Sequence, residues 1–428
     1  MSFFNNRYSS LLITLLLISL MVSSCGTTHQ IRHDLKRHEK GASYFKGFVL
    51  YNPISKKEII NYNGTKYFTP ASNTKLFTFY TAYKSLKDSV KSLAYFRAKD
   101  SLIIEGTADP SLFYGFDSTK VVAFLKNATD SIYLLDKKID ENPYGSGWAW
   151  DDYLYYYMPE KSLFPIYGNI VKYSLENDSL VSYPSYFNQY ISVIDSVIQT
   201  RELTENKFYY AHSLDKKIYE VPFITSNSIV AEILKHLTQK KVKLITKEKE
   251  YDFTFLYGLN YDELYKKLLV DSDNHIAEQL MLQVGKEVAN TYSVSAAIEY
   301  SLTNYLQELP QKPRWVDGSG LSRYNLFSPN DMVFLLDKMY REIPQQKLFD
   351  YFPVGGTSGT LKNWYGNDKP FVYAKSGSLS NNYNLSGYLT TKKGTLLIFS
   401  SMNNHFKVSS KAVKKDIEEI LLEIYNTY

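Results

Sequence analysis

The run Ser72-Asn73-Thr74-Lys75 lies where an extended pattern in the sequence gives way to a helical one. Before it, residues 45–51, 58–62 and 65–69 are rich in aromatic and β-branched side chains between turn residues, which predicts three strands. After it, apolar side chains recur at helical spacing, which predicts a helix over residues 73–86. We therefore expect Ser72 at the start of a helix.

The spacing of Ser72 and Lys75 suits a serine nucleophile. A serine hydroxyl is weak until a base removes its proton, and residues three apart on a helix lie on the same face. The lysine must be neutral to act as the base, and burial or a second nearby cation lowers a lysine pKa, so a second lysine is expected close by. The pattern has little weight alone, because Ser213-Leu214-Asp215-Lys216 also matches it and reads as a solvated turn.

Two further short motifs follow along the chain. Ser272-Asp273-Asn274 is expected in a loop between helices predicted over 260–267 and 275–288, and Lys375-Ser376-Gly377 at the end of a strand. Class A β-lactamases and penicillin-binding proteins carry motifs of these three kinds. The order and context of the motifs, rather than any one of them, predict a serine enzyme that reacts with penicillin.

The composition is that of an ordinary globular protein. Of 428 residues, 44% are hydrophobic and 22% charged, which allows two or three folding units. Short aromatic and β-branched runs between residues 91 and 245 predict a β-rich inserted region. A helix, three strands and a last helix are predicted over 330–340, 371–374, 384–390, 395–401 and 411–428. This order predicts an α/β (α+β) fold, with a central antiparallel sheet completed by both chain ends and flanked by helices.

Several classes of ligand are not expected. The formal net charge of +5 is spread without a basic block, which argues against nucleic acid, although it suits an anionic polymer such as the cell wall. His29 and His33 are one helical turn apart and could bind a metal weakly, but a solvated tail is the favoured interpretation. We expect no metal and no cofactor, and the sequence leaves the oligomeric state open.

The first residues resemble an export signal. Arg7 precedes an apolar run over residues 11–22 that is short for a membrane span. The run ends at Val22-Ser23-Ser24-Cys25, which resembles a bacterial lipoprotein box, and Cys25 is the only cysteine, so no internal disulfide can form. We expect lipid on Cys25 and a chain tethered in the periplasm; Gly26 favours the outer membrane. The alternative is an accidental cysteine in an ordinary signal peptide.

The flanks of the motifs, from about Ala42 onward, resemble the penicillin-binding protein 4 family, the D-Ala-D-Ala carboxypeptidases and endopeptidases of peptidase family S13. The run Pro70–Lys75 looks like that family's nucleophile motif in full. The other matching runs are residues 109–112 (DPSL), 147–152 (GWAWDD), 317–323 (DGSGLSR), 375–379 (KSGSL) and 385–388 (LSGY). Ordinary β-lactamases lack the DGSGLSR run. The family has Lys-Thr-Gly where this chain has Lys-Ser-Gly, a change that keeps the hydroxyl.

The resemblance implies the catalytic roles. Ser72 would attack the penultimate D-Ala carbonyl of peptidoglycan stem peptides, and Lys75 would take its proton. Ser272 and Lys375 would relay a proton to the departing D-Ala. β-Lactams would react at the same serine as covalent inhibitors.

The resemblance also implies the binding groups. The backbone N–H groups of Ser72 and Ser378 would form the oxyanion hole. Asp152 and Arg323 would bind the amine and the carboxylate of a diamino diacid at the third peptide position, unless Asp152 caps a helix and Arg323 lies in a core ion pair. Asn274, which counts with Ser72, Lys75, Ser272 and Lys375 among the catalytic residues, would hold the substrate backbone. Lys375 and Ser376 would engage the terminal carboxylate, and Gly377 and Ser378 would complete the substrate-binding residues.

The expected domains follow from these assignments. Residues 1–25 would be the lipoprotein signal peptide and 26–41 a tether, of which 30–40 could instead form a short helix. Residues 42–90 and 246–428 would together form the peptidase domain. Residues 91–245 would form one or two small β-rich accessory domains, an insert that looks shorter than in the longest relatives.

Two rival functions remain open at this point. A β-lactamase shares the fold and the motifs but hydrolyses its acyl-enzyme through a separate base, and no Glu-x-x-Leu-Asn occurs between Ser72 and Ser272. A catalytically silent peptidoglycan-binding lipoprotein would keep the cleft, although every catalytic position is filled here. The balance of carboxypeptidase and endopeptidase activity is not predicted.

Overall fold

The computed structural model describes residues 28–41, 44–128, 131–177, 179–196, 199–211, 218–246 and 250–428. The expected signal peptide, Cys25 and the second Ser-x-x-Lys run at Ser213 lie outside these residues. Within them, no helix combines the length and the apolar character that crossing a membrane requires.

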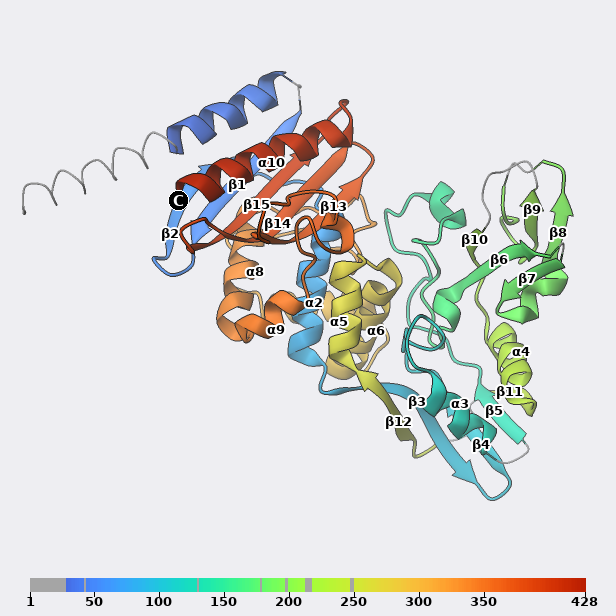
Figure 1. The fold of residues 1–428 in the computed structure, drawn as a ribbon. Helices are drawn as coiled ribbons and strands as arrows, with labels where there is room; N and C mark the ends of the chain where they lie inside the picture. The colour runs from blue at the N-terminus through green and yellow to red at the C-terminus, as the bar shows by residue number, and fades with distance from the viewer. Residues whose placement is uncertain are drawn as a thin grey trace, which may run out of the picture. The chain divides into compact units, whose positions relative to one another are not determined.

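The chain forms two compact units (Figure 1). The first contains the chain as far as Leu76, residues 308–314 and residues 325–428, and the second contains 77–307 and 315–324. This division differs from the domains expected from the sequence, because the helices over 261–304 group with the insert.

The first unit is built on a five-stranded antiparallel sheet in the order β13-β14-β15-β1-β2. The strands are β1 (Phe45–Asn52), β2 (Lys57–Tyr62), β13 (Val372–Leu379), β14 (Asn382–Thr390) and β15 (Leu396–Asn404). β1 lies beside β15 with Phe45 opposite Asn404, so both ends of the chain complete the sheet. The predicted fold class is confirmed.

Two predicted details of this sheet are wrong. The strand expected over 65–69 is reduced to a single bridge between Phe68 and Phe327, because the chain turns at Pro70 into the segment that carries Ser72. Lys375-Ser376-Gly377 does not end a strand. It lies inside β13, which pairs with β14 as far as Leu379.

Side-chain alternation gives the two faces of the sheet different partners. On one face, Leu385 and Leu389 join a core with α10 (Ser410–Thr427). On the other face, the Tyr388 hydroxyl donates to the Leu336 carbonyl of α8 (Pro329–Glu342) at 2.8 Å. The short α9 (Gln345–Asp350) follows α8, and neither α9 nor the precise ends of α8 were predicted.

Residues 28–41 are helical and run alongside α10 (Figure 1). Ile31 and Leu35 are fully buried in the same core as α10. The Thr28 hydroxyl lies 2.7 Å from the hydroxyl of Tyr428. The sequence left open whether this segment is a tether or a short helix. The structure shows a helix, and it packs on the core of the first unit.

The second unit contains three sheets, in the orders β11-β5-β4-β3-β12, β10-β6-β7 and β8-β9. The strands of the largest are β3 (Ser89–Ala98), β4 (Ser101–Glu105), β5 (Ser131–Leu135), β11 (Lys241–Ile245) and β12 (Thr254–Asn260). The others are β6 (Ile170–Glu176), β7 (Ser179–Tyr183), β8 (Ile191–Ile194), β9 (Phe208–Ala211) and β10 (Ile218–Pro222). The domain boundary expected at residue 245 therefore falls inside the largest sheet.

The insert also contains helices that the sequence pattern did not indicate. α3 (Thr119–Lys126) lies between β4 and β5, and α4 (Asn227–Thr238) precedes β11. β4 pairs with β5, and β5 with β11, in parallel. Parallel neighbours need a long crossover connection, usually helical, which accounts for both helices.

Four helices complete the second unit, and one of them, which contains Phe77, crosses the boundary between the two units. They are α2 (Lys75–Ser85), α5 (Tyr261–Val270), α6 (Asn274–Ala289) and α7 (Val294–Asn304), of which α7 was not predicted. From Phe77 onward α2 faces the others: Thr81 lies 2.7 Å from Ser301 of α7, and the ring of Phe79 meets that of Tyr265 of α5 edge-on. The helix that begins at Lys75 therefore ends inside the second unit.

The docked 28–41 helix makes a testable contribution to stability. Replacing the fully buried Leu35 with alanine should lower the free energy of unfolding by about 2–5 kcal/mol, because it leaves a cavity in the core. Urea unfolding followed by circular dichroism measures the change. Lys36→Ala, on the exposed face of the same helix, is the control and should change little. Equal stability of both variants would show that the helix is a tether.

Candidate active site

Ser72 lies on a tight turn, not on α2 itself. Residues Ala71–Thr74 form one turn of 3-10 helix that leads directly into α2 at Lys75. Ala71 has φ of 49°, in the left-handed region that non-glycine residues rarely adopt. Ala71 and Asn73 are buried while Ser72 is only half-buried, so the turn presents Ser72 toward the surface.

Buried polar side chains of the sheet hold this turn in place. Asn404 accepts a hydrogen bond from the Thr69 N–H at 2.6 Å, and Asn384 donates to the Thr69 carbonyl at 2.9 Å. The Asn73 amide donates to the hydroxyl of Ser386 at 2.8 Å. Sequence reasoning missed these residues. The sequence did contain a signal for them, since the polar residues Asn382, Asn384 and Ser386 alternate along β14.

The second lysine that the chemistry requires is present. Lys75 Nζ lies 3.0 Å from Ser72 Oγ. Lys375 is fully buried in β13 and its Nζ donates to the Ser376 carbonyl at 2.8 Å. Burial, and then the charge of Lys75, hold the pKa of Lys375 well below its usual range. The neutral form of Lys375 is therefore favoured.

β13 approaches the turn so closely that only glycine fits at residue 377. A Cβ on Gly377 would lie 2.5 Å from the Pro70 carbonyl oxygen, 2.8 Å from the Asn73 nitrogen and 2.9 Å from the Ser72 nitrogen. All three are backbone atoms, so a side chain could not be accommodated by a rotamer change. Ser378 follows directly on the strand and is exposed. The backbone of Ser72 thus lies beside the strand that carries Ser378.

A second hydroxyl lies beside Ser376 that was not anticipated from the sequence. Ser376 Oγ donates to Thr360 Oγ1 at 2.8 Å. Thr360 belongs to the exposed, glycine-rich run 355–360, which precedes β13. The feature of the sequence that could have indicated Thr360 is the cluster of Gly, Ser and Thr residues at 355–360, before β13.

In the second unit, the Ser272-Asp273-Asn274 loop is pinned by its own polar groups. Asp273 caps α6 by accepting from the Ile276 N–H at 2.9 Å, and it also accepts from the Tyr114 hydroxyl at 2.8 Å. The Asn274 amide donates to the Tyr157 carbonyl at 2.8 Å. Ser272 has φ of 61°, a strained conformation of the kind that persists where the surroundings impose it.

Asp152 and Arg323 also lie in the second unit. Asp152 lies inside a 3-10 turn (Trp150–Leu154), where its carboxylate accepts from the Tyr157 hydroxyl at 3.0 Å, so it does not cap a helix. Arg323 is exposed, and among the described residues no ion pair involves it, so the core ion pair does not form. The Arg323 backbone N–H donates to the Gly147 carbonyl at 3.1 Å, so the segment 317–323 is bonded to the segment 147–152.

The expected site residues thus fall into two groups. The first unit brings together Ser72, Lys75, Lys375, Ser376, Gly377 and Ser378. The second unit holds Ser272, Asn274, Asp152 and Arg323, with Asn274 and Asp152 both bonded to Tyr157.

One cluster among the described residues has metal-ligating side chains. His38, Asp416 and Glu419 place one ligand atom each within 4.8 Å of one another, and neither His29 nor His33 belongs to this cluster. Burial, and then the charge of buried Lys46, lower the pKa of His38, and the same cation opposes a metal ion at this cluster.

The sequence over residues 32–207 and 259–427 matches the model of the D-Ala-D-Ala carboxypeptidase 3 (S13) family. The chain belongs to this family. The predicted resemblance is confirmed, and membership makes the chain a serine-type D-Ala-D-Ala carboxypeptidase.

Known relatives of this family member align over most of its length. It is 24% identical to D-alanyl-D-alanine carboxypeptidase DacB of Haemophilus influenzae over 89% of this chain and 90% of that protein. It is 25% identical to penicillin-sensitive carboxypeptidase A of Dictyostelium discoideum, over 88% and 85% respectively.

Solved structures share the fold of the S13 chain. The crystal structure of penicillin binding protein 4 from Haemophilus influenzae superposes with a TM-score of 0.73 at 21% identity, covering 92% of this chain and 97% of that one. A penicillin G-acylated predatory endopeptidase of Bdellovibrio bacteriovorus superposes with a TM-score of 0.52 at 14% identity, covering 89% and 92%.

The close approach at residue 377 predicts a large effect of one methyl group. Gly377→Ala should slow acylation by penicillin at least about 100-fold, because β13 must move away from the turn that positions Ser72. Labelling with fluorescent penicillin measures the rate. Gly41→Ala is the control, since a Cβ there meets nothing within 4 Å. Acylation of the Gly377 variant at the wild-type rate would show that the close approach is not needed.

Proposed function

We propose that the chain cleaves peptidoglycan stem peptides through an acyl-enzyme on Ser72, removing the terminal D-Ala and also cutting D-Ala cross-links. The observation that carries this proposal is the 3.0 Å contact of Lys75 Nζ with Ser72 Oγ beside the buried Lys375. Membership of the S13 family supports the peptide substrate.

The proposed reaction begins at the lysine pair. Lys75, as a neutral amine, takes the proton of Ser72 Oγ as the oxygen attacks the penultimate D-Ala carbonyl. The N–H groups of Ser72 and Ser378 stabilise the resulting oxyanion, an effect worth a few kcal/mol of the barrier. Ser272 and Lys375 relay the proton that Lys75 has taken to the nitrogen of the departing D-Ala, which returns Lys75 to its neutral form, and the C–N bond breaks to leave an ester on Ser72. Water then hydrolyses the ester and regenerates the serine.

The proposed substrate contacts use both groups of residues. Lys375, Ser376 and the neighbouring Thr360 would bind the terminal carboxylate, and Asn274 the peptide backbone. Asp152 and Arg323 would bind the amine and carboxylate of a diamino diacid at the third position. The half-buried carboxylate of Asp152 and the exposed guanidinium of Arg323 support these roles. We further propose that residues 42–90 and 246–428 act as one peptidase domain.

We propose that the chain acts on the cell wall and reacts covalently with β-lactams, which is supported by the β-lactam complex of penicillin binding protein 4 from Haemophilus influenzae and by the penicillin G-acylated Bdellovibrio endopeptidase. An exported protein is consistent with this activity. The finer proposal is that Cys25 carries lipid and holds the enzyme in the periplasm, at the outer membrane. Only two residues separate Cys25 from the first described residue of the 28–41 helix, so the lipid would attach close to the folded unit.

The catalytic claim is tested by digesting defined muropeptides. Wild-type enzyme should release D-alanine from the monomeric pentapeptide and split the cross-linked dimer, as measured by mass spectrometry. Ser72→Ala should lose roughly a thousandfold or more of both activities, because it removes the attacking oxygen. Ser213→Ala, in the other Ser-x-x-Lys run, is the matched control and should keep full activity.

Each rival function predicts a different result in these assays. Equal background release by wild type and Ser72→Ala would support the silent binding protein. A penicillin adduct on Ser72 that turns over rapidly would support the β-lactamase. A long-lived adduct together with D-alanine release agrees with the proposal.

The lipid proposal is tested by fractionation. Cys25→Ser should move the protein from the membrane to the soluble fraction of cells, because it removes the thiol that would carry lipid. Ser72→Ala retains Cys25 and should remain with the membrane. A serine variant that stays membrane-bound would rule out Cys25 as the anchor.

A further inference from the structure

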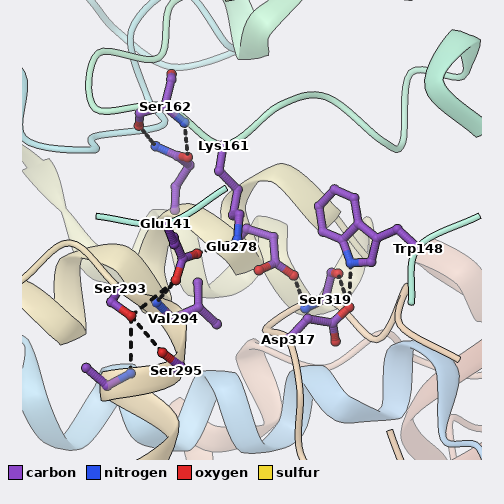
Figure 2. A network of polar contacts seen from close by, with 12 residues as sticks. Glu141, Trp148, Lys161, Ser162, Glu278, Ser293, Val294, Ser295, Asp317 and Ser319 are labelled. Carbon is purple, nitrogen blue, oxygen red and sulfur yellow. Dashed lines mark hydrogen bonds and ion pairs between the residues drawn. The ribbon is translucent and has the colours of Figure 1, made fainter. Parts of the chain in front are cut away.

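A buried carboxyl group lies one helical turn after Asn274 on α6 (Figure 2). Glu278 is 2% exposed, and one of its oxygens accepts a hydrogen bond from the Ser319 N–H at 2.7 Å. The other oxygen, Oε2, is buried and has no hydrogen-bond partner among the described residues. Glu278 thus joins the helix that carries Asn274 to the loop of residues 317–323, which carries Arg323.

Two charged groups act on Glu278: Asp317, in the 317–323 loop, and Lys161, in the chain that precedes β6. Asp317, from the loop, is 1% exposed and accepts from the Gly320 N–H at 2.9 Å, the Ser322 N–H at 2.6 Å and the Trp148 indole N–H at 2.9 Å. These bonds fold the loop around Asp317. A charge that repels Asp317 therefore acts on the conformation of the whole loop.

Lys161 is the second charged group, and it interacts with both Glu278 and Glu141. Lys161 is buried and forms an ion pair with Glu141. Glu141 also accepts from the Val294 N–H at 2.8 Å and the Ser293 hydroxyl at 3.2 Å (Figure 2). Because Lys161 is already paired with a carboxylate, it compensates the charge of Glu278 only in part.

We propose that Glu278 is a positioning residue whose protonated form holds the 317–323 loop on α6, and whose ionisation weakens the binding of stem peptides with a charged third residue. The inference rests on the substrate-binding roles proposed above for Asn274 and Arg323. Glu278 itself touches no reacting atom and acts through the helix and the loop.

The pH range follows from the surroundings of Glu278. Burial first, and then the charge of Asp317, raise the pKa of Glu278 to about 7, and these outweigh the charge of Lys161 and the hydrogen bonds from Ser319, which lower it. A carboxyl whose pKa is raised on folding contributes stability below its unfolded pKa and loses it as the pH rises through the folded pKa. The loop is therefore held most firmly in acid and is released as the pH passes neutrality.

The kinetic test compares two glutamates of the same helix. For wild type, the KM of a pentapeptide with a diamino diacid third residue should rise on the order of three- to tenfold from about pH 6 to about pH 8, with kcat nearly constant. Glu278→Gln cannot ionise and should abolish this rise. Glu287→Gln changes an exposed glutamate on α6 and should leave the rise intact. A pentapeptide with alanine at the third position should show no rise with any of these proteins.

A binding measurement keeps the inference separate from the catalytic proposal. The affinity of the pentapeptide is measured across the same pH range in the Ser72→Ala background, with and without Glu278→Gln. Affinity that falls with pH only when Glu278 is present supports the inference even if Ser72 proves not to be the nucleophile. The same pH dependence with glutamine at 278, or its loss in Glu287→Gln, overturns it.

Lys161→Gln provides an independent check. Without this cation the ionised form of Glu278 loses its attractive partner, so the change in KM and in affinity should move to higher pH. An unmoved midpoint would assign the titration to another group and overturn the inference.

Discussion

The packing of β13 on the turn at Ser72 controls the geometry of the residues proposed to be catalytic in the first unit. A Cβ on Gly377 would clash with three backbone atoms at that turn, so the strand and the turn lie in close contact. Residues two apart on a strand share a face, and Lys375 therefore points toward the turn, where it is buried close to Lys75. A shift of β13 by one residue would turn Lys375 to the opposite face and separate the amines. The pairing of all eight residues of β13 with β14 opposes such a shift.

Several features of the residues proposed to react are unfavourable in free energy. An ammonium group at Lys375 is disfavoured by burial and by Lys75, and the left-handed conformations of Ala71 and Ser272 each cost of the order of 1–3 kcal/mol. Buried hydrogen bonds hold the strained segments in place: Asn384, Asn404 and Asn73 bond the turn to the sheet, and Asp273 anchors the other loop to Tyr114. Strain and buried polar groups thus occur together at the residues proposed to react.

The sequence predicted most of the fold, and the residues that it proposed as reactive in the first unit lie together. Runs of aromatic and β-branched residues between turn residues located β1, β2, β14 and β15. The spacing of Ser72 and Lys75, with the need for a neutral amine, predicted a second lysine, and Lys375 fills that role. The prediction of a strand over 65–69 was wrong because the local sequence does not show that this segment pairs with another segment at one residue only, through the bridge between Phe68 and Phe327. The supporting Asn384 and Thr360 were missed because their roles depend on contacts with segments distant in the sequence.

Helix α6 shows why the insert groups with the helices that follow it. The apolar stripe of Ile276, Leu280 and Val284 predicted one buried face, yet the polar Glu278, Gln279 and Gln283 are buried too. Each of them bonds a different loop: Glu278 the Ser319 N–H, Gln279 the Ser162 carbonyl at 2.8 Å, and Gln283 the Thr107 carbonyl at 3.3 Å. Such buried polar groups are costly unless satisfied, so the loops and the helix constrain one another. The insert therefore belongs to the support of the Ser272-Asp273-Asn274 loop, because the residues that fix α6 come from the insert and from the 317–323 loop.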